Sequence, residues 1–126
     1  MTKYELMTQK VLDIEDDLTF VVSDNKDIWM DQKTIAVLLG TTVGNVSYHF
    51  NKKFEDGELF EEEKKLDLNN SKNTRSLLIN PDSKKQPILY NFESILAVAF
   101  SVNSKRALEV HRQVKKTLAT IFYTPN

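Results

Sequence analysis

The 126-residue sequence predicts an α+β fold, a winged helix-turn-helix with two small β-hairpins and a long C-terminal helix. Three observations lead to this prediction. Residues at about 32–55 have the spacing of two short helices joined by a turn, short apolar runs flank polar turns at 24–27 and 80–82, and apolar positions recur with a helical period to about residue 123. A chain of this length builds one core, so a single domain over 1–126 is expected.

The first hairpin is predicted at residues 18–30. Aromatic and β-branched residues at 18–23 and 28–30 flank an Asn/Asp-rich turn, which is typical of two short strands. Asp31 follows the second strand and is placed to cap the first helix of the helix-turn-helix.

The helix-turn-helix is predicted from local signals. Gly40 supplies a left-handed residue at the end of the first helix, Thr41 or Thr42 caps the second, and Asp-Gly at 56–57 ends it. Such pairs present the second helix to a DNA groove, although they also serve as packing modules. The inner faces of the two helices are expected to carry Ile35, Ala36, Leu39, Val46 and Phe50.

A second hairpin is predicted at about 75–90, around an Asn-Pro-Asp turn. It is a candidate wing with Lys84 and Lys85 near its tip, where they would reach phosphates, and a solvated lysine-rich turn is the alternative. Pro87 indicates that its strand lies at a sheet edge or begins there. The charged run at 58–65 is expected to be a solvated helix face or its end.

Two C-terminal helices are predicted at about 92–123. Asn91 caps the first, which is apolar almost all round and is therefore expected at the centre of the core. Lys105 and Arg106 begin the last helix, where positive charge opposes the helix dipole, so a phosphate or an acidic neighbour is expected beside them. The last helix carries an apolar stripe that is either core or a homodimer contact: Leu108, His111, Val114, Leu118, Ile121 and Phe122.

Composition favours a soluble, cytoplasmic protein. The chain has no cysteine, no secretory signal is evident at its start, and no stretch is long and apolar enough to span a membrane. The net charge of −1 hides an asymmetry, because residues 1–63 carry six lysines and fourteen acids, whereas residues 64–126 carry eleven basic residues and four acids. This asymmetry permits a basic binding face, and mutual attraction of the two halves is the alternative.

Three blocks of sequence, in order, resemble the N-terminal domain of the RhuM-type virulence-associated proteins. They are Trp-x-x-Gln-Lys at 29–33, Glu-Asp-Gly-Glu-Leu at 55–59, and the segment from Tyr-Asn at 90–91 to Val-Asn-Ser-Lys-Arg at 102–106, and the resemblance spans roughly residues 18–122. It implies a bacterial or mobile-element protein, often longer than this chain, whose helix-turn-helix is expected to bind double-stranded DNA and regulate transcription. This sequence departs from the family at Val43, Gly44 and Tyr48, where polar or basic residues are usual.

The helical spacing that buries Val46 and Phe50 turns the candidate DNA contacts outward. Asn45 and Asn51 are candidate readers of an adenine edge, whereas Thr42, Tyr48 and Lys52 would contact phosphates. Ordinary hydrated surface side chains are the alternative for each. The full candidate set is Lys33, Thr42, Val43, Asn45, Ser47, Tyr48, Asn51, Lys52, Lys84 and Lys85.

No catalytic, metal or cofactor site is predicted. The two histidines, His49 and His111, fit no metal-ligand pattern, and no glycine-rich phosphate loop is present. The sequence therefore predicts a DNA-binding protein that is not an enzyme and has no small-molecule substrate. The rival hypothesis is a protein-interaction or assembly module that keeps the helix-turn-helix and uses Val43, Tyr48 and the last helix as its contact surface.

Overall fold

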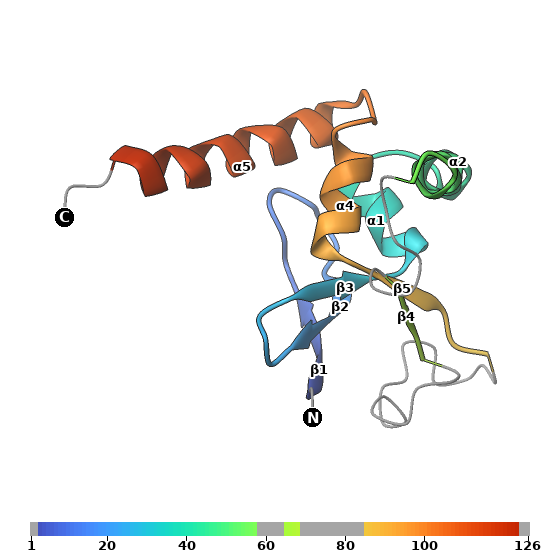
Figure 1. Cartoon of the computed structure of the whole chain (residues 1–126). Helices are drawn as coiled ribbons and strands as arrows, with labels where there is room; N and C mark the ends of the chain where they lie inside the picture. Colours follow the sequence, from blue (N-terminus) through green and yellow to red (C-terminus); the bar gives the residue numbers. More distant parts are fainter. Residues whose placement is uncertain (1–2, 58–64, 69–84, 124–126) are drawn as a thin grey trace.

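A computed structural model describes residues 3–57, 65–68 and 85–123 (Figure 1). In these residues the chain forms four helices and one antiparallel sheet of five strands, so the α+β prediction is confirmed. The strands are β1 (Tyr4–Gln9), β2 (Leu18–Ser23), β3 (Ile28–Met30), β4 (Lys65–Asp67) and β5 (Ile88–Asn91). The helices are α1 (Gln32–Leu39), α2 (Val43–Glu55), α4 (Phe92–Ala99) and α5 (Lys105–Tyr123).

The predicted β2–β3 hairpin is confirmed, and it belongs to a larger sheet with the strand order β1-β2-β3-β5-β4. Strand β1 was not predicted, and it pairs with β2 along its whole length, from Tyr4 opposite Ser23 to Gln9 opposite Leu18. The side chains of β1 are mostly exposed, so this strand lacks the alternating apolar pattern that marks a half-buried strand.

The second hairpin differs from its prediction. Strand β5 begins immediately after Pro87, and its described partners are β3 on one side and β4 on the other, so β5 is not an edge strand. The proline is compatible with an inner position because it precedes the first paired residue, Ile88. Residues 75–84 of the predicted wing lie outside the described residues. The same holds for residues 58–64 of the predicted charged run. The last residue of that run, Lys65, begins strand β4 and is not part of a helix.

The helices pack on one face of the sheet, where Figure 1 shows them together, and the main core lies between them and the strands. Because side chains alternate along a strand, neighbouring residues such as Phe20 and Val21 serve opposite faces. A second, smaller cluster on the other face contains Val21, Trp29, Leu66, Leu68 and Leu89. The main core includes Phe20, Met30, Ile35, Leu39, Phe50, Tyr90, Ile95 and Val98.

Helix α4 was predicted to lie at the centre of the core, and it is only partly buried. The side chain of Asn91 caps it as expected, by accepting a hydrogen bond of 3.0 Å from the backbone N–H of Ser94. Only one side of α4 is buried, however, and Phe92 and Phe100 at its two ends are exposed. An apolar sequence all round the helix therefore leaves apolar surface outside the core.

Helix α5 begins against the end of α1. Arg106 donates a hydrogen bond from Nη1 to the carbonyl of Val37 at 2.9 Å, and the Ser104 hydroxyl donates to the carbonyl of Leu39. The expected phosphate or acidic neighbour of Arg106 is thus replaced by the carbonyl end of α1, where positive charge is favourable. His111 holds the next turn, because its Nε2 lies 2.7 Å from the carbonyl of Ala99. The start of α5 is therefore bonded to both α1 and α4.

The β2–β3 turn contains a strained residue, Lys26, with φ of 67°. A residue with a Cβ costs roughly 1–2 kcal/mol in this region, and glycine removes that cost while adding about 0.5–1 kcal/mol of chain entropy to the unfolded state. Lys26→Gly is therefore expected to raise the free energy of unfolding by about 0.5–1 kcal/mol in urea denaturation. Lys26→Ala keeps the Cβ and should leave stability unchanged, and a less stable Lys26→Gly protein would contradict the explanation.

Candidate nucleic-acid interface

The two helices of the candidate interface begin and end at the predicted residues. The backbone N–H of Thr34 donates to the Asp31 carboxylate at 2.8 Å, which caps α1. Gly40 adopts φ of 63° and ψ of 42°, so it ends α1 in the left-handed conformation. The turn leads to Thr42, whose hydroxyl accepts from the backbone N–H of Asn45 at 3.1 Å and caps α2. Local capping thus fixes where α2 starts.

The inner face of α2 is held by aromatic stacking. Phe50 is buried, and its ring lies parallel to that of Tyr90 on β5 at a centroid distance of 4.2 Å. Phe54 stacks on Phe50 at 6.3 Å, and the Lys65 ammonium lies 4.7 Å from the centre of the Phe54 ring. These contacts tie α2 to strands β4 and β5, and the positive charge over the ring adds a cation–π attraction.

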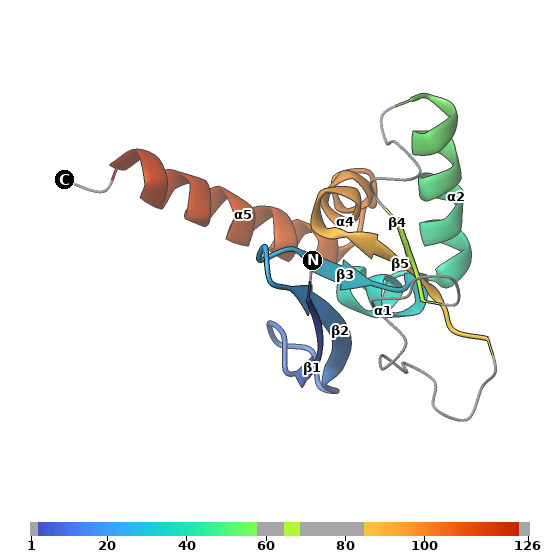
Figure 2. The ribbon, with the colours of Figure 1, turned by 60° about the horizontal axis from the view of Figure 1, so that its bottom comes forward.

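The outer face of α2 is uncovered. The helix stands at the upper right of the molecule in the view of Figure 2. Tyr48 is 52% exposed and Val43 is 43% exposed, although both have large side chains. The candidate contacts Thr42, Asn51 and Lys52 are exposed as well, and Ser47 is half-buried. The structure thus brings most of the candidate contacts on α2 to one open surface, which also includes Gly44. These contacts are Thr42, Val43, Ser47, Tyr48, Asn51 and Lys52.

Asn45 is placed differently from the other candidates. It is half-buried, and its Nδ2 donates a hydrogen bond of 2.9 Å to the Thr41 hydroxyl. An adenine edge is read by both the oxygen and the nitrogen of the amide. Because the nitrogen is already oriented by Thr41, Asn45 serves the start of α2, and Asn51 is left as the exposed amide of this helix.

Lys33 and Lys85 line the same hollow, although 52 positions separate them in the sequence. This hollow has a volume of about 570 Å³ and lies between the start of α1 and the chain entering β5. It is not uniformly basic, because Asp31 and Asp67 line it too. Lys84, the other predicted wing lysine, lies outside the described residues.

A second, shallower hollow of about 390 Å³ lies at the end of α2. Tyr48, Asn51 and Lys52 line it together with Glu55 and Asp56, which sequence analysis did not include among the site residues. Helical spacing was the available signal, because residues three and four positions after Asn51 and Lys52 share their face. His49 is half-buried beside this hollow, and its ring stacks on Tyr48 at 5.2 Å. Carboxylates thus offset the lysine charge at this end of the surface.

These residues define an α+β domain in which a capped helix pair is fixed on an antiparallel sheet with one helix face left open. No family model, curated protein or solved structure matches the chain. The resemblance to RhuM-type proteins therefore stays a prediction. Within residues 3–57, 65–68 and 85–123, no group of three His, Asp or Glu side chains is placed to hold a metal ion, and no helix is long and apolar enough to cross a membrane.

Proposed function

We propose that the chain is a winged helix-turn-helix protein that binds double-stranded DNA, with α2 in the major groove and the antiparallel strand pair β4–β5 as part of the wing. One observation carries the proposal. The inner face of α2 is held against β5 by the Phe50–Tyr90 stack, while Tyr48, Asn51 and Lys52 on its outer face remain exposed. A rigidly held helix with an uncovered polar face is the arrangement by which helix-turn-helix proteins read DNA.

The exposed side chains divide into two roles in this proposal. Asn51 contacts a base edge through its amide, and Val43 packs against a thymine methyl group. Lys52, Lys33 and Lys85 contact phosphates on either side of the groove, which supplies most of the affinity. The predicted resemblance to RhuM-type proteins implies a role in transcriptional regulation in a bacterium or mobile element, and the proposal includes that role.

The proposal predicts weak, strongly salt-dependent binding. Three phosphate contacts give a slope of about −2.7 in a plot of log affinity against log salt concentration, so affinity should fall about 40-fold between 50 and 200 mM salt. Lys52→Ala should reduce the slope by about one and weaken binding to all duplexes alike, whereas Asn51→Ala should flatten the preference among sequences. Fluorescence anisotropy with a selected duplex and a scrambled duplex measures both effects.

Lys10→Ala is the matched control for Lys52→Ala. Lys10 is exposed in the β1–β2 loop, on a different element from the candidate contacts, so its loss should leave the slope unchanged. Equal effects of the two substitutions would show non-specific charge attraction. Absence of any complex at 50 mM salt would reject the proposal.

A protein-interaction module is the second candidate function. It is favoured by the exposed apolar side chains of Val43 and Tyr48 on α2. Tyr48 also shares a hollow with the carboxylates of Glu55 and Asp56, which repel a duplex. If the partner is a protein, Tyr48→Ala should abolish its binding whereas Lys52→Ala should change it little, because a buried aromatic side chain dominates such contacts. The two substitutions have the opposite order of effect in the DNA proposal.

A further inference from the structure

The distal half of α5 extends away from the rest of the molecule, as Figure 1 shows. Its apolar stripe continues along this extension, where Leu118 is 49% exposed, Ile121 is 68% exposed and Phe122 is 79% exposed. These residues, called here the α5 tip, follow Val114 at spacings of three and four positions, so they prolong the helix face that packs on the domain. A helix that packs only on its own domain has no contact for these exposed apolar side chains to make.

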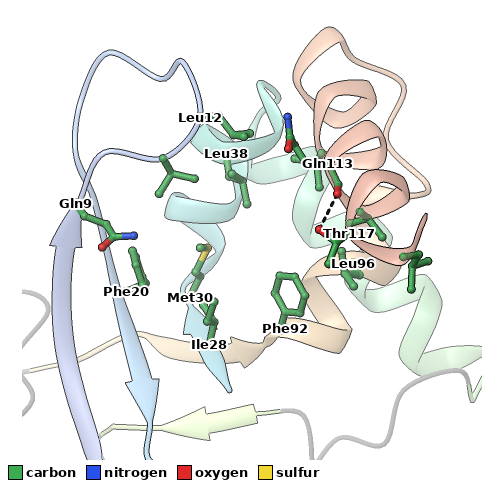
Figure 3. Close-up of a pocket in the computed structure, with 14 residues that line it drawn as sticks. Gln9, Leu12, Phe20, Ile28, Met30, Leu38, Phe92, Leu96, Gln113 and Thr117 are labelled. Atoms are coloured by element: carbon green, nitrogen blue, oxygen red, sulfur yellow. Dashed lines mark hydrogen bonds between the residues drawn. The ribbon is translucent and has the colours of Figure 1, made fainter. Parts of the chain in front are cut away.

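An apolar groove of about 490 Å³ lies beside α5 (Figure 3). Phe20 and Met30 from the sheet form its floor, and Phe92 from α4 lies in one wall. Val114 and Leu118 of α5 line another wall, so Leu118 belongs both to the groove and to the α5 tip. The opposite wall is the loop between β1 and β2, from which Leu12 faces the groove.

Leu12 is held in an unfavourable backbone conformation. Its φ is 52°, a region that a leucine rarely adopts, and yet its side chain is still partly exposed in the groove wall. The loop around it is well fixed, because Ile14 is buried in the main core and its backbone N–H donates to the carbonyl of Val11. The loop thus keeps an apolar residue at a position where the backbone is strained and where glycine or asparagine would cost less.

The charges of the loop and the helix are complementary. The loop carries four exposed carboxylates beside Leu12, and none of them has an ion-pair partner within the described part of the chain: Asp13, Glu15, Asp16 and Asp17. Helix α5 carries five basic residues and a single acid, Glu109, whose pKa is lowered by hydrogen bonds from Gln113 and Arg112 and by the nearby positive charge of Arg112 and Lys116. A second α5 in the groove would place basic side chains next to the acidic loop.

We infer that the occupant of this groove is the α5 tip of a second copy of the same chain, and that two copies exchange tips about a two-fold axis. Each copy supplies both a tip and a groove, so the contact is made twice and is self-complementary, as in most homodimers. Apolar burial of Ile121 and Phe122 stabilises the dimer, and attraction between the loop and the helix orients it. The inference does not depend on DNA binding, and its test contains no DNA.

Sedimentation equilibrium of the full chain at 1–200 µM measures the association. The wild-type protein is expected to be a dimer at the upper end of this range. Ile121→Glu places a charge in the apolar contact and should raise the dimer dissociation constant at least 100-fold. Ala119→Glu is the matched control, because Ala119 is exposed on the charged side of the same helix, and it should leave the constant within threefold of the wild-type value.

The groove is tested separately with Leu12→Asn. A positive φ costs asparagine less than leucine, so this variant should fold at least as stably as the wild type while its dimer weakens at least tenfold. Mixing Leu12→Asn with Ile121→Glu should restore association, because the heterodimer retains one intact tip and one intact groove in the same contact.

Three results would overturn the inference. They are a monomeric wild-type protein throughout the concentration range, a dimer that Ile121→Glu and Ala119→Glu weaken equally, and a mixture of the two complementary variants that associates no better than either alone. A monomeric wild-type protein would mean that the groove binds a small apolar ligand or another segment. Either of the other two results would mean that the dimer uses a different surface.

Discussion

Replacing Phe50 by alanine is expected to lower the free energy of unfolding by about 3–5 kcal/mol, the usual cost of removing a large aromatic side chain from a core. Phe50 is 1% exposed, and its ring touches both Tyr90 on β5 and Phe54 on α2. Its loss leaves a cavity between helix and sheet and removes the stack that orients α2. Urea denaturation followed by circular dichroism measures the change.

Tyr48→Ala is the control for this prediction, because it removes an aromatic side chain from the opposite face of the same helix. Tyr48 is mostly exposed, so stability should change by no more than about 0.5 kcal/mol. Similar losses for the two variants would mean that the outer face of α2 is covered and would contradict the assignment of inner and outer faces.

Gly40→Ala is expected to destabilise the protein by about 1–2 kcal/mol, because a Cβ is unfavourable at the left-handed φ of 63°. A second effect adds to this one. The new Cβ would lie 3.3 Å from both Cβ and Cδ of Arg106, so the arginine would have to shift from the position in which it donates to the carbonyl of Val37. Thermal or chemical denaturation measures the loss.

The same substitution at Gly44 should have the opposite sign. Gly44 lies in the first turn of α2, and the nearest atom outside its own backbone, the Thr42 hydroxyl oxygen, is 3.9 Å from a built Cβ. Gly44→Ala is therefore expected to raise the free energy of unfolding by about 0.5–1 kcal/mol, since alanine is the better helix former and reduces the entropy of the unfolded chain. Stabilisation by both substitutions would show that Gly40 is not required for the turn.

Local features of the fold could be predicted from the sequence. Asp31, Gly40, Thr42 and Asn91 each act within three or four residues of their own position, so their capping roles depend on short-range hydrogen bonds that the sequence alone specifies. The burial of Phe50 follows in the same way from its spacing to Val46. These local features are enough to predict where the two helices begin and end and which face of α2 points outward.

Features that depend on distant partners could not be predicted. Strand β5 pairs with β3 and β4, and neither pairing is encoded in the turn that suggested a hairpin at 75–90. The guanidinium of Arg106 donates to the backbone carbonyl of Val37, which lies 69 positions earlier, and no local sequence pattern indicates this contact. One local contact in the candidate site was missed as well, because the Nδ2 of Asn45 donates to the Thr41 hydroxyl four positions earlier, whereas Asn51 is exposed. Helical period predicts the face on which a side chain lies, but it does not specify which polar neighbour that side chain bonds.

The junction of α5 with α1 has a consequence for any assembly built through α5. Because Ser104 and Arg106 bond the last carbonyls of α1, and α1 packs directly on α2, the direction of α5 is set relative to α2 without an intervening hinge. Two copies joined by their α5 tips would hold their α2 helices at one fixed separation and orientation. A DNA target would then be an inverted repeat with a single permitted spacing, and inserting half a helical turn, about five base pairs, between its halves would abolish simultaneous binding of both copies.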